Sequence, residues 1–169
     1  MIKTKTKSKK YPLKVTLKNG KKLTIPKQSA FKNAFLHDHG CSIMAEYVAL
    51  QYVGVHKWPI DILKWHRKHD KKNIKAKVTV KGVSVGIAKI GKADTAYYSH
   101  VTADRIRDAM KKGRCVIMEQ KDPIHSIALI PDGGKLYKVS YGTVTQVTAS
   151  GIAKTATTSK TYRGMVVIK

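Results

Sequence analysis

The stretch from residue 34 to residue 54 constrains the fold of this chain more than any other. Polar and glycine residues lead up to Cys41, and apolar residues then recur at helical spacing until Gly54. This pattern is typical of an amphipathic helix that ends at a glycine. A wide apolar face needs cover along one whole side, so we expect a helix from Cys41 to about Val53 that packs on a sheet. The apolar residues that define it are Ile43, Met44, Tyr47, Val48, Leu50 and Val53.

Cys41, at the start of this helix, has two interpretations. Free backbone N–H groups and the positive end of the helix dipole favour an anion there, so the thiol ionises more readily than a free cysteine, as a nucleophile requires. Cysteine is also one of the most buried residue types, and Cys41 could equally be a small apolar filler. The only other cysteine is Cys115. Two cysteines are too few for a disulfide framework in a chain of 169 residues, and we expect free thiols.

The composition limits the classes of partner. No apolar run approaches the roughly 18 residues that a membrane span needs, so we expect none. Lys and Arg number 34 against 10 Asp and Glu, a net charge of +24 that attracts polyanions. The absence of RRM, KH, zinc-finger and helix-turn-helix patterns argues against nucleic acid and leaves an anionic lipid surface or an anionic cell-wall polymer. No apolar stretch follows the first lysines as in a signal peptide, so we expect either an intracellular protein or a part cut from a longer exported chain.

The order of patterns along the chain predicts an α+β fold. We expect a basic disordered tail over residues 1–10 and a single domain over residues 11–169. Asn19-Gly20 predicts a hairpin between residues 13–17 and 22–25. A second helix begins at Pro59, a third is capped by Ser99 or Thr102 and ends at Gly113, and residues 78–88 fit a strand, a loop or a short helix. An antiparallel sheet then follows from short strands at 114–120, 124–130, 136–141, 144–148 and 164–169.

Two groups of histidines have a spacing that suits a metal ion. His66 and His69 lie three residues apart on the second helix, but the lysines around them favour an exposed basic face. His37, His39 and Cys41 would share one side of an extended backbone, with Asp38 nearby. The further ligands that a tetrahedral site needs are not evident close by, and we predict neither a metal ion nor any other cofactor.

His125 is the candidate base for a Cys41 thiolate. It heads the strand at 124–130, where an imidazole is costly unless something holds it, and it could equally be a structural histidine. If the turn at 131–134 pairs Ile130 with Lys135, His125 lies opposite Ser140; a one-residue bulge would place Tyr141 there instead. Either hydroxyl could fix the imidazole tautomer.

These motifs together resemble the papain-like cysteine peptidases of the C39-like type. They are His-x-Gly-Cys at a helix start, Lys-Lys-Gly-Arg-Cys-Val-Ile before a strand, and a His-led strand with a Tyr-Lys-Val-Ser-Tyr-Gly return. The resemblance covers residues 28–169. It implies a papain-like fold with helices packed on a C-terminal antiparallel sheet, Cys41 as nucleophile and His125 as general base.

The resemblance also implies an oxyanion-hole glutamine, for which Gln28 is the candidate, with the backbone N–H of Cys41 as second donor. Gln28 lies further before the cysteine than is usual in the family, and Phe35 occupies the expected neighbourhood. Ser140 stands where the family has Asp or Asn, and Ser42-Ile43 stands where a second small residue is usual.

From these observations we expect a cysteine peptidase or related thiol amide hydrolase. Its catalytic residues would be Cys41, His125 and Ser140, with Gln28 at the oxyanion. The substrate would be a peptide or protein, cut at a peptide or isopeptide bond, in an anionic cell-envelope setting. The alternative is a non-catalytic papain-like module that binds a polyanion or a protein partner.

Overall fold

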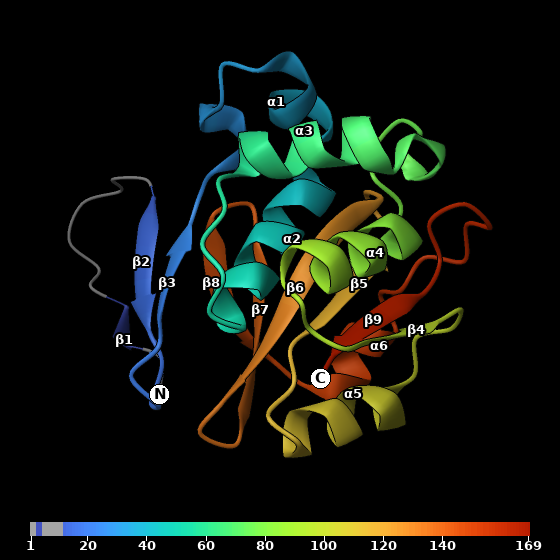
Figure 1. Ribbon diagram of the computed structural model, residues 1–169. Coiled ribbons are helices and arrows are strands. Elements are labelled where there is room, and N and C mark those ends of the chain that lie inside the picture. Colours follow the sequence, from blue (N-terminus) through green and yellow to red (C-terminus); the bar gives the residue numbers. More distant parts are fainter. Residues whose placement is uncertain (1–2, 5–11) are drawn as a thin grey trace.

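The structure is a computed structural model that describes residues 3–4 and 12–169 (Figure 1). Of the predicted tail over residues 1–10, it describes only the strand β1 (Lys3–Thr4), which pairs antiparallel with β2 (Leu13–Thr16). The rest of that prediction lies outside the described residues. The predicted hairpin is confirmed, because β2 pairs with β3 (Lys22–Ile25).

An antiparallel sheet of six strands forms the centre of the fold. Its order is β4 (Thr95–Tyr98), β9 (Met165–Ile168), β5 (Val116–Gln120), β6 (His125–Asp132), β7 (Lys135–Ser140) and β8 (Thr143–Val147). The five strands predicted from the second half of the sequence are all present. The edge strand β4 was not predicted, and it pairs with β9.

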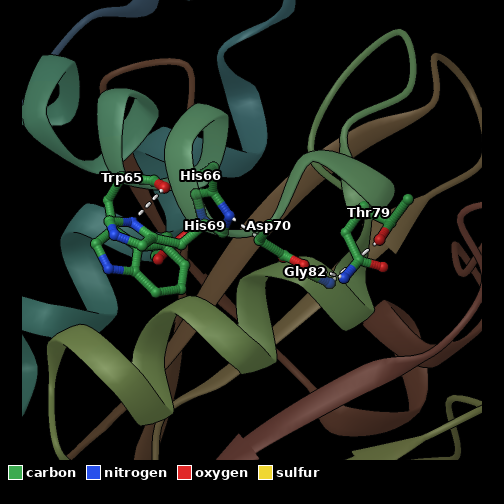
Figure 2. Close-up of polar contacts among 8 residues, drawn as sticks. Trp65, His66, His69, Asp70, Thr79 and Gly82 are labelled. Atoms are coloured by element: carbon green, nitrogen blue, oxygen red, sulfur yellow. Dashed lines mark hydrogen bonds and ion pairs between the residues drawn. The ribbon is translucent and has the colours of Figure 1, made fainter.

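The helices begin and end where local signals place them. The predicted starts are confirmed at Cys41 for α2 (Cys41–Tyr52), at Pro59 for α3 (Pro59–His69) and at the Thr102 cap for α5 (Ala103–Lys111). The ambiguous segment is the helix α4 (Val80–Ile90), in which the Thr79 hydroxyl accepts the Gly82 N–H at 3.1 Å (Figure 2). The sequence patterns missed α1 (Ala34–His39), α6 (Ala149–Ala153) and the short 3-10 helices η1 (Gln28–Ala30) and η2 (Lys71–Asn73).

The two faces of the central sheet carry different helices. Side chains alternate along each strand, so Ile117 and Ala128 pack in the core with α2, α3 and α4, whereas Met118 and Ile127 pack in the core with α5 and α6. Figure 1 shows α2 and α4 in front of the sheet. The predicted arrangement of N-terminal helices on a C-terminal sheet therefore holds for α2 to α4, and two later helices cover the other face.

Helix α2 is the centre of the packing. We expected it to be amphipathic, and this is wrong: all twelve of its residues are buried, because β6, β3, α3 and α4 surround it. A helix buried on every side must pair its polar groups internally. Gln51 does so by accepting the Thr24 N–H at 2.8 Å and donating to the Thr24 carbonyl at 2.9 Å. This burial fixes the helix start, and with it Cys41.

Candidate active site

Cys41 is the first residue of α2, directly after Gly40. An added Cβ at Gly40 would come within 2.3 Å of the Leu36 carbonyl oxygen, so only glycine lets α1 meet α2 at this angle. The junction places the thiol at the amino end of a buried twelve-residue helix. Backbone N–H groups and the helix dipole therefore favour negative charge at the sulfur.

All four predicted site residues line one narrow pocket. Gln28 comes from η1, Cys41 from α2, His125 from the start of β6 and Ser140 from the end of β7. The cavity has a volume of only about 20 Å³, and Cys41 and His125 are each 6% exposed. The fold thus gathers at one place four side chains that span 113 positions of the chain, from 28 to 140.

His125 is held by stacking. Its ring lies on the ring of Tyr141, with centroids 3.7 Å apart and planes 10° from parallel. Its Nε2 is buried and has no hydrogen-bond partner among the residues that the structure describes. Burial, followed by the charges of Lys77 and Lys138, lowers the pKa of His125 to about 4. At neutral pH the imidazole is therefore uncharged and able to accept a proton.

The predicted register of the β6–β7 hairpin is wrong by two residues. Ile130 pairs with Tyr137, not with Lys135, because Pro131 and Asp132 extend β6 and Asp132 pairs with Lys135. The turn consists of Gly133 and Gly134 alone, whose φ values of +56° and +77° suit a two-residue hairpin turn. Ser140 consequently does not lie opposite His125, although it lines the same pocket. Of the two candidate hydroxyl residues, Tyr141 is the one that contacts the His125 ring.

Gln28 is tied to α1. Its side-chain Nε2 donates to the His37 carbonyl at 2.9 Å, and the residue lines the same pocket as Cys41. Because residues 34–39 are helical, His37 and His39 do not form the extended arrangement considered for a metal ion. Within the described residues, no group of three His, Cys, Asp or Glu side chains could hold a metal ion.

Three further residues lie beside Cys41 and were missed by the sequence patterns. The Sγ of Cys41 is 3.7 Å from the Ser126 Oγ and 3.6 Å from the Lys77 Nζ. Both of these side chains bind Glu119, Ser126 through its hydroxyl and Lys77 through an ion pair. Burial raises the pKa of Glu119 and the Lys77 ammonium opposes that rise, so the buried charges depend on each other.

Alternation of side chains along the strands could have predicted the positions of Ser126 and Glu119. Ser126 shares its face with Ala128, which packs towards α2, and it pairs across the ladder with Glu119. Lys77 lies in the segment between η2 and α4, where no periodic pattern places a side chain.

His66 corrects the prediction of an exposed basic face on α3. His66 is fully buried, with Nε2 2.8 Å from the Glu46 Oε2, whereas His69 is exposed. The Nδ1 of His66 lies 3.5 Å from the Asp70 Oδ2 (Figure 2). The helical period explains the difference, because His66 lies three and four residues after the buried Leu63 and Ile62. An added Cβ at Gly86 would come within 2.0 Å of the Glu46 Oε1, so α4 needs glycine where it passes this cluster.

Comparisons with known proteins bear on the fold. No family model and no curated protein matches the chain. Its structure is similar to a crystal structure described as that of a "putative C39-like peptidase from Bacillus anthracis", with a TM-score of 0.58 over 78% of this chain and 89% of that chain. The two sequences are 11% identical, so the similarity extends to the fold alone.

The fold class is therefore the α+β, papain-like class that the sequence motifs suggested. Over the described ranges, 3–4 and 12–169, no helix is long and apolar enough to cross a membrane.

Proposed function

We propose that this protein is a cysteine peptidase or related thiol amide hydrolase that cuts a peptide or isopeptide bond. One observation carries the proposal. Cys41 at the amino end of a buried helix and His125 at the head of a strand line the same pocket, in a fold similar to that of the protein described as a "putative C39-like peptidase". A thiol and a neutral imidazole in one pocket are the starting point for acyl transfer through sulfur, and since His125 Nε2 has no hydrogen-bond partner within the described residues, the proposal requires the two side chains to approach when substrate binds.

The proposed reaction has two halves. His125 takes the Cys41 thiol proton as Sγ attacks the amide carbon, and the oxyanion accepts hydrogen bonds from the Gln28 side chain and the Cys41 backbone N–H. The C–N bond then breaks, and His125 returns the proton to the leaving amine. Water hydrolyses the thioester with His125 again as base, which releases a carboxylate and restores the thiol.

The residues around His125 take supporting roles in this proposal. Stacking on Tyr141 fixes the plane of the imidazole, and Ser140, which lines the same pocket, is the residue that we propose to orient it when substrate binds. Neither residue brings a negative charge, so the protonated imidazole gains less stabilisation than a carboxylate would provide.

The test is a cleavage assay with the full chain and a mixture of peptide and branched isopeptide substrates, in which mass spectrometry follows new amino groups. Cys41→Ala and His125→Ala should eliminate cleavage. Cys115→Ala is the matched control, because Cys115 is a buried thiol outside the pocket, and it should cleave as the wild type does. Equal cleavage by Cys41→Ala and wild type would refute the hydrolase.

A non-catalytic binding module is the second candidate, favoured by a separate groove. Trp58 and Trp65 line it with three lysines, and its volume is about 670 Å³; the lysines are Lys57, Lys64 and Lys68. Trp58 is 64% exposed and stacks on Tyr47, so its ring is presented to solvent on a rigid base. With a net charge of +24, an anionic cell-wall polymer is the partner we propose for this groove.

Titration with poly(glycerol phosphate) at increasing salt tests the binding module. Affinity should fall steeply as salt rises, since lysine contacts act through released counterions. Affinity that does not change with salt would exclude a polyanion. Binding that persists in Cys41→Ala without any peptide cleavage by the wild type would favour the module over the hydrolase.

A further inference from the structure

A buried ion pair lies directly beneath the candidate nucleophile. Glu119 on β5 is 1% exposed and Lys77 is 7% exposed, and their side chains are in contact. An ammonium group is strongly hydrated and is rarely withdrawn from water without a use for its charge or a complete set of partners.

The Lys77 ammonium has a contact for each of its three N–H bonds. One is Glu119, the second is the Cys41 Sγ at 3.6 Å, and the third side faces the ring of Tyr162, whose centroid is 5.1 Å from Nζ. Held on three sides, Nζ is fixed in place beside the sulfur.

Ser126 can accept a hydrogen bond from the Cys41 thiol but has no hydrogen to donate to the thiolate. Its single hydrogen is donated to Glu119, so towards Cys41 it can only accept, and the Cys41 S–H donates to its Oγ at 3.7 Å. Once the thiol has lost its proton, this contact offers the sulfur no donor. Among the residues that the structure describes, the side chain that donates to the sulfur is Lys77.

We propose that Lys77, positioned by Glu119, supplies the positive charge that stabilises the Cys41 thiolate. A catalytic role for Lys77 rests on the proposed function. The effect of Lys77 on the Cys41 sulfur can be measured without a substrate. The other titratable groups that line the pocket with Cys41 are His125 and Tyr141. Burial raises the pKa of Tyr141, so at neutral pH its hydroxyl carries no charge.

The low pKa of His125 is consistent with Lys77 as the positive charge beside the sulfur. Burial and the nearby Lys77 lower it to about 4, so at neutral pH the cation beside the sulfur is Lys77 and not an imidazolium. An imidazolium in such a site is more acidic than usual, since its pKa is about 4. It therefore gives the proton up readily to a leaving amine.

The experiment measures how fast iodoacetamide alkylates Cys41 as a function of pH, with the modified peptides quantified by mass spectrometry. Cys115 is an internal reference, because burial raises its pKa to about 12. Lys77→Met should move the half-maximal pH of Cys41 alkylation upward and slow the reaction at pH 7 by about tenfold or more, since one pH unit corresponds to a tenfold change in thiolate. Lys77→Arg should keep part of the wild-type rate because it keeps the charge.

Lys75→Met is the matched control, since Lys75 lies in the same segment but is exposed. It should alkylate as the wild type does. Lys77→Met leaves Glu119 buried without its partner, so the double variant Lys77→Met/Glu119→Gln, which removes both charges, protects the test against misfolding. Slower alkylation in the folded double variant supports the proposal, and a wild-type pH profile in that variant overturns it.

The same measurements separate this inference from the proposed function. Alkylation that depends on Lys77 in a protein that cleaves no peptide would keep the thiolate site and reject the hydrolase. Peptide cleavage by a protein whose alkylation pH profile does not depend on Lys77 would keep the hydrolase and reject the role of Lys77. If both ideas hold, Lys77→Met should lower kcat far more than it changes KM.

Discussion

Helix α2 contributes one residue to each of two buried charged clusters, which differ in their access to a pocket. We call them the open cluster, around Cys41, and the sealed cluster, around Glu46. At its start, Cys41 contacts Lys77 and Ser126, which both bind Glu119, and the sulfur lines the pocket. Five residues later Glu46 binds His66, which also faces Asp70, and these three side chains are sealed among α2, α3 and α4. The first cluster offers a reactive atom to a ligand, whereas the second offers none.

The histidines of the two regions show what this difference means electrostatically. Burial, followed by the charges of Lys77 and Lys138, lowers the pKa of His125 to about 4. Burial opposes the charged form of His66 too, but the hydrogen bond and charge of Glu46, with the charge of Asp70, outweigh it and raise the pKa of His66. The two environments thus shift the imidazoles in opposite directions, towards the neutral form for His125 at the pocket and towards the charged form for His66 inside the core.

The largest expected effect concerns the open cluster. Cys41→Ala and His125→Ala should each lower kcat/KM by roughly a thousandfold or more, and the double variant should be no worse, because residues that act as one unit are not additive. Kinetics on the substrate identified by the cleavage assay measure this. His69→Ala, on the exposed side of α3, should retain full activity. Additive losses in the double variant would mean that the two residues act separately.

Substitutions in the sealed cluster of Glu46, His66 and Asp70 should lower the free energy of unfolding. His66→Ala leaves Glu46 buried without its ion-pair partner, which should cost about 3–5 kcal/mol of unfolding free energy. Urea denaturation measures the loss, and His69→Ala, which removes an exposed ring, should change stability by less than about 0.5 kcal/mol. Equal stability of the two variants would show that the Glu46–His66 pair contributes nothing to the fold.

The pH dependence of stability should separate the same two histidines. The pKa of His125 is lower in the folded state, so its contribution falls as pH drops from about 6.5 towards 4, where only the unfolded state takes up the proton. The pKa of His66 is raised, so its contribution is complete below about 6.5 and is lost as pH rises through the folded value. Unfolding free energies of wild type, His125→Ala and His66→Gln between pH 4 and 9 test both signs. If the His66→Gln curve parallels that of the wild type above pH 6.5, His66 carries no linked proton.

Most of the fold follows from local signals in the sequence. Pro59, Thr102 and Gly113 mark helix ends that the structure places at the same points, and the turn residues mark the strands. The hairpin register was missed because Pro131 and Asp132 suit a turn as well as a strand end. Only the paired glycines, both with positive φ, decide between these alternatives.

The parts that local signals could not predict depend on tertiary contacts. Helix α4 holds β-branched residues and two glycines, a poor helical sequence, and Gly86 is needed there because Glu46 lies against it. The candidate nucleophile and base were predicted from their positions at the start of a helix and a strand, which are local features. Lys77 was not, because only the folded chain brings that segment to Cys41.

The smallest expected effect concerns Ser140. It lines the pocket at the end of β7, and the buried Nε2 of His125 has no hydrogen-bond partner within the described part of the chain. Ser140→Ala should keep part of the activity, because a neutral hydroxyl orients an imidazole less strongly than a carboxylate does. Ser140→Asn should raise kcat by a few fold if its amide oxygen reaches that nitrogen, and Ser140→Asp should also raise the kinetic pKa of His125, since a nearby negative charge favours the imidazolium. The pH profile of kcat/KM separates the two variants. An unchanged profile in Ser140→Asp would show that position 140 does not act on His125, and would leave the stacked ring of Tyr141 as the group that orients the base.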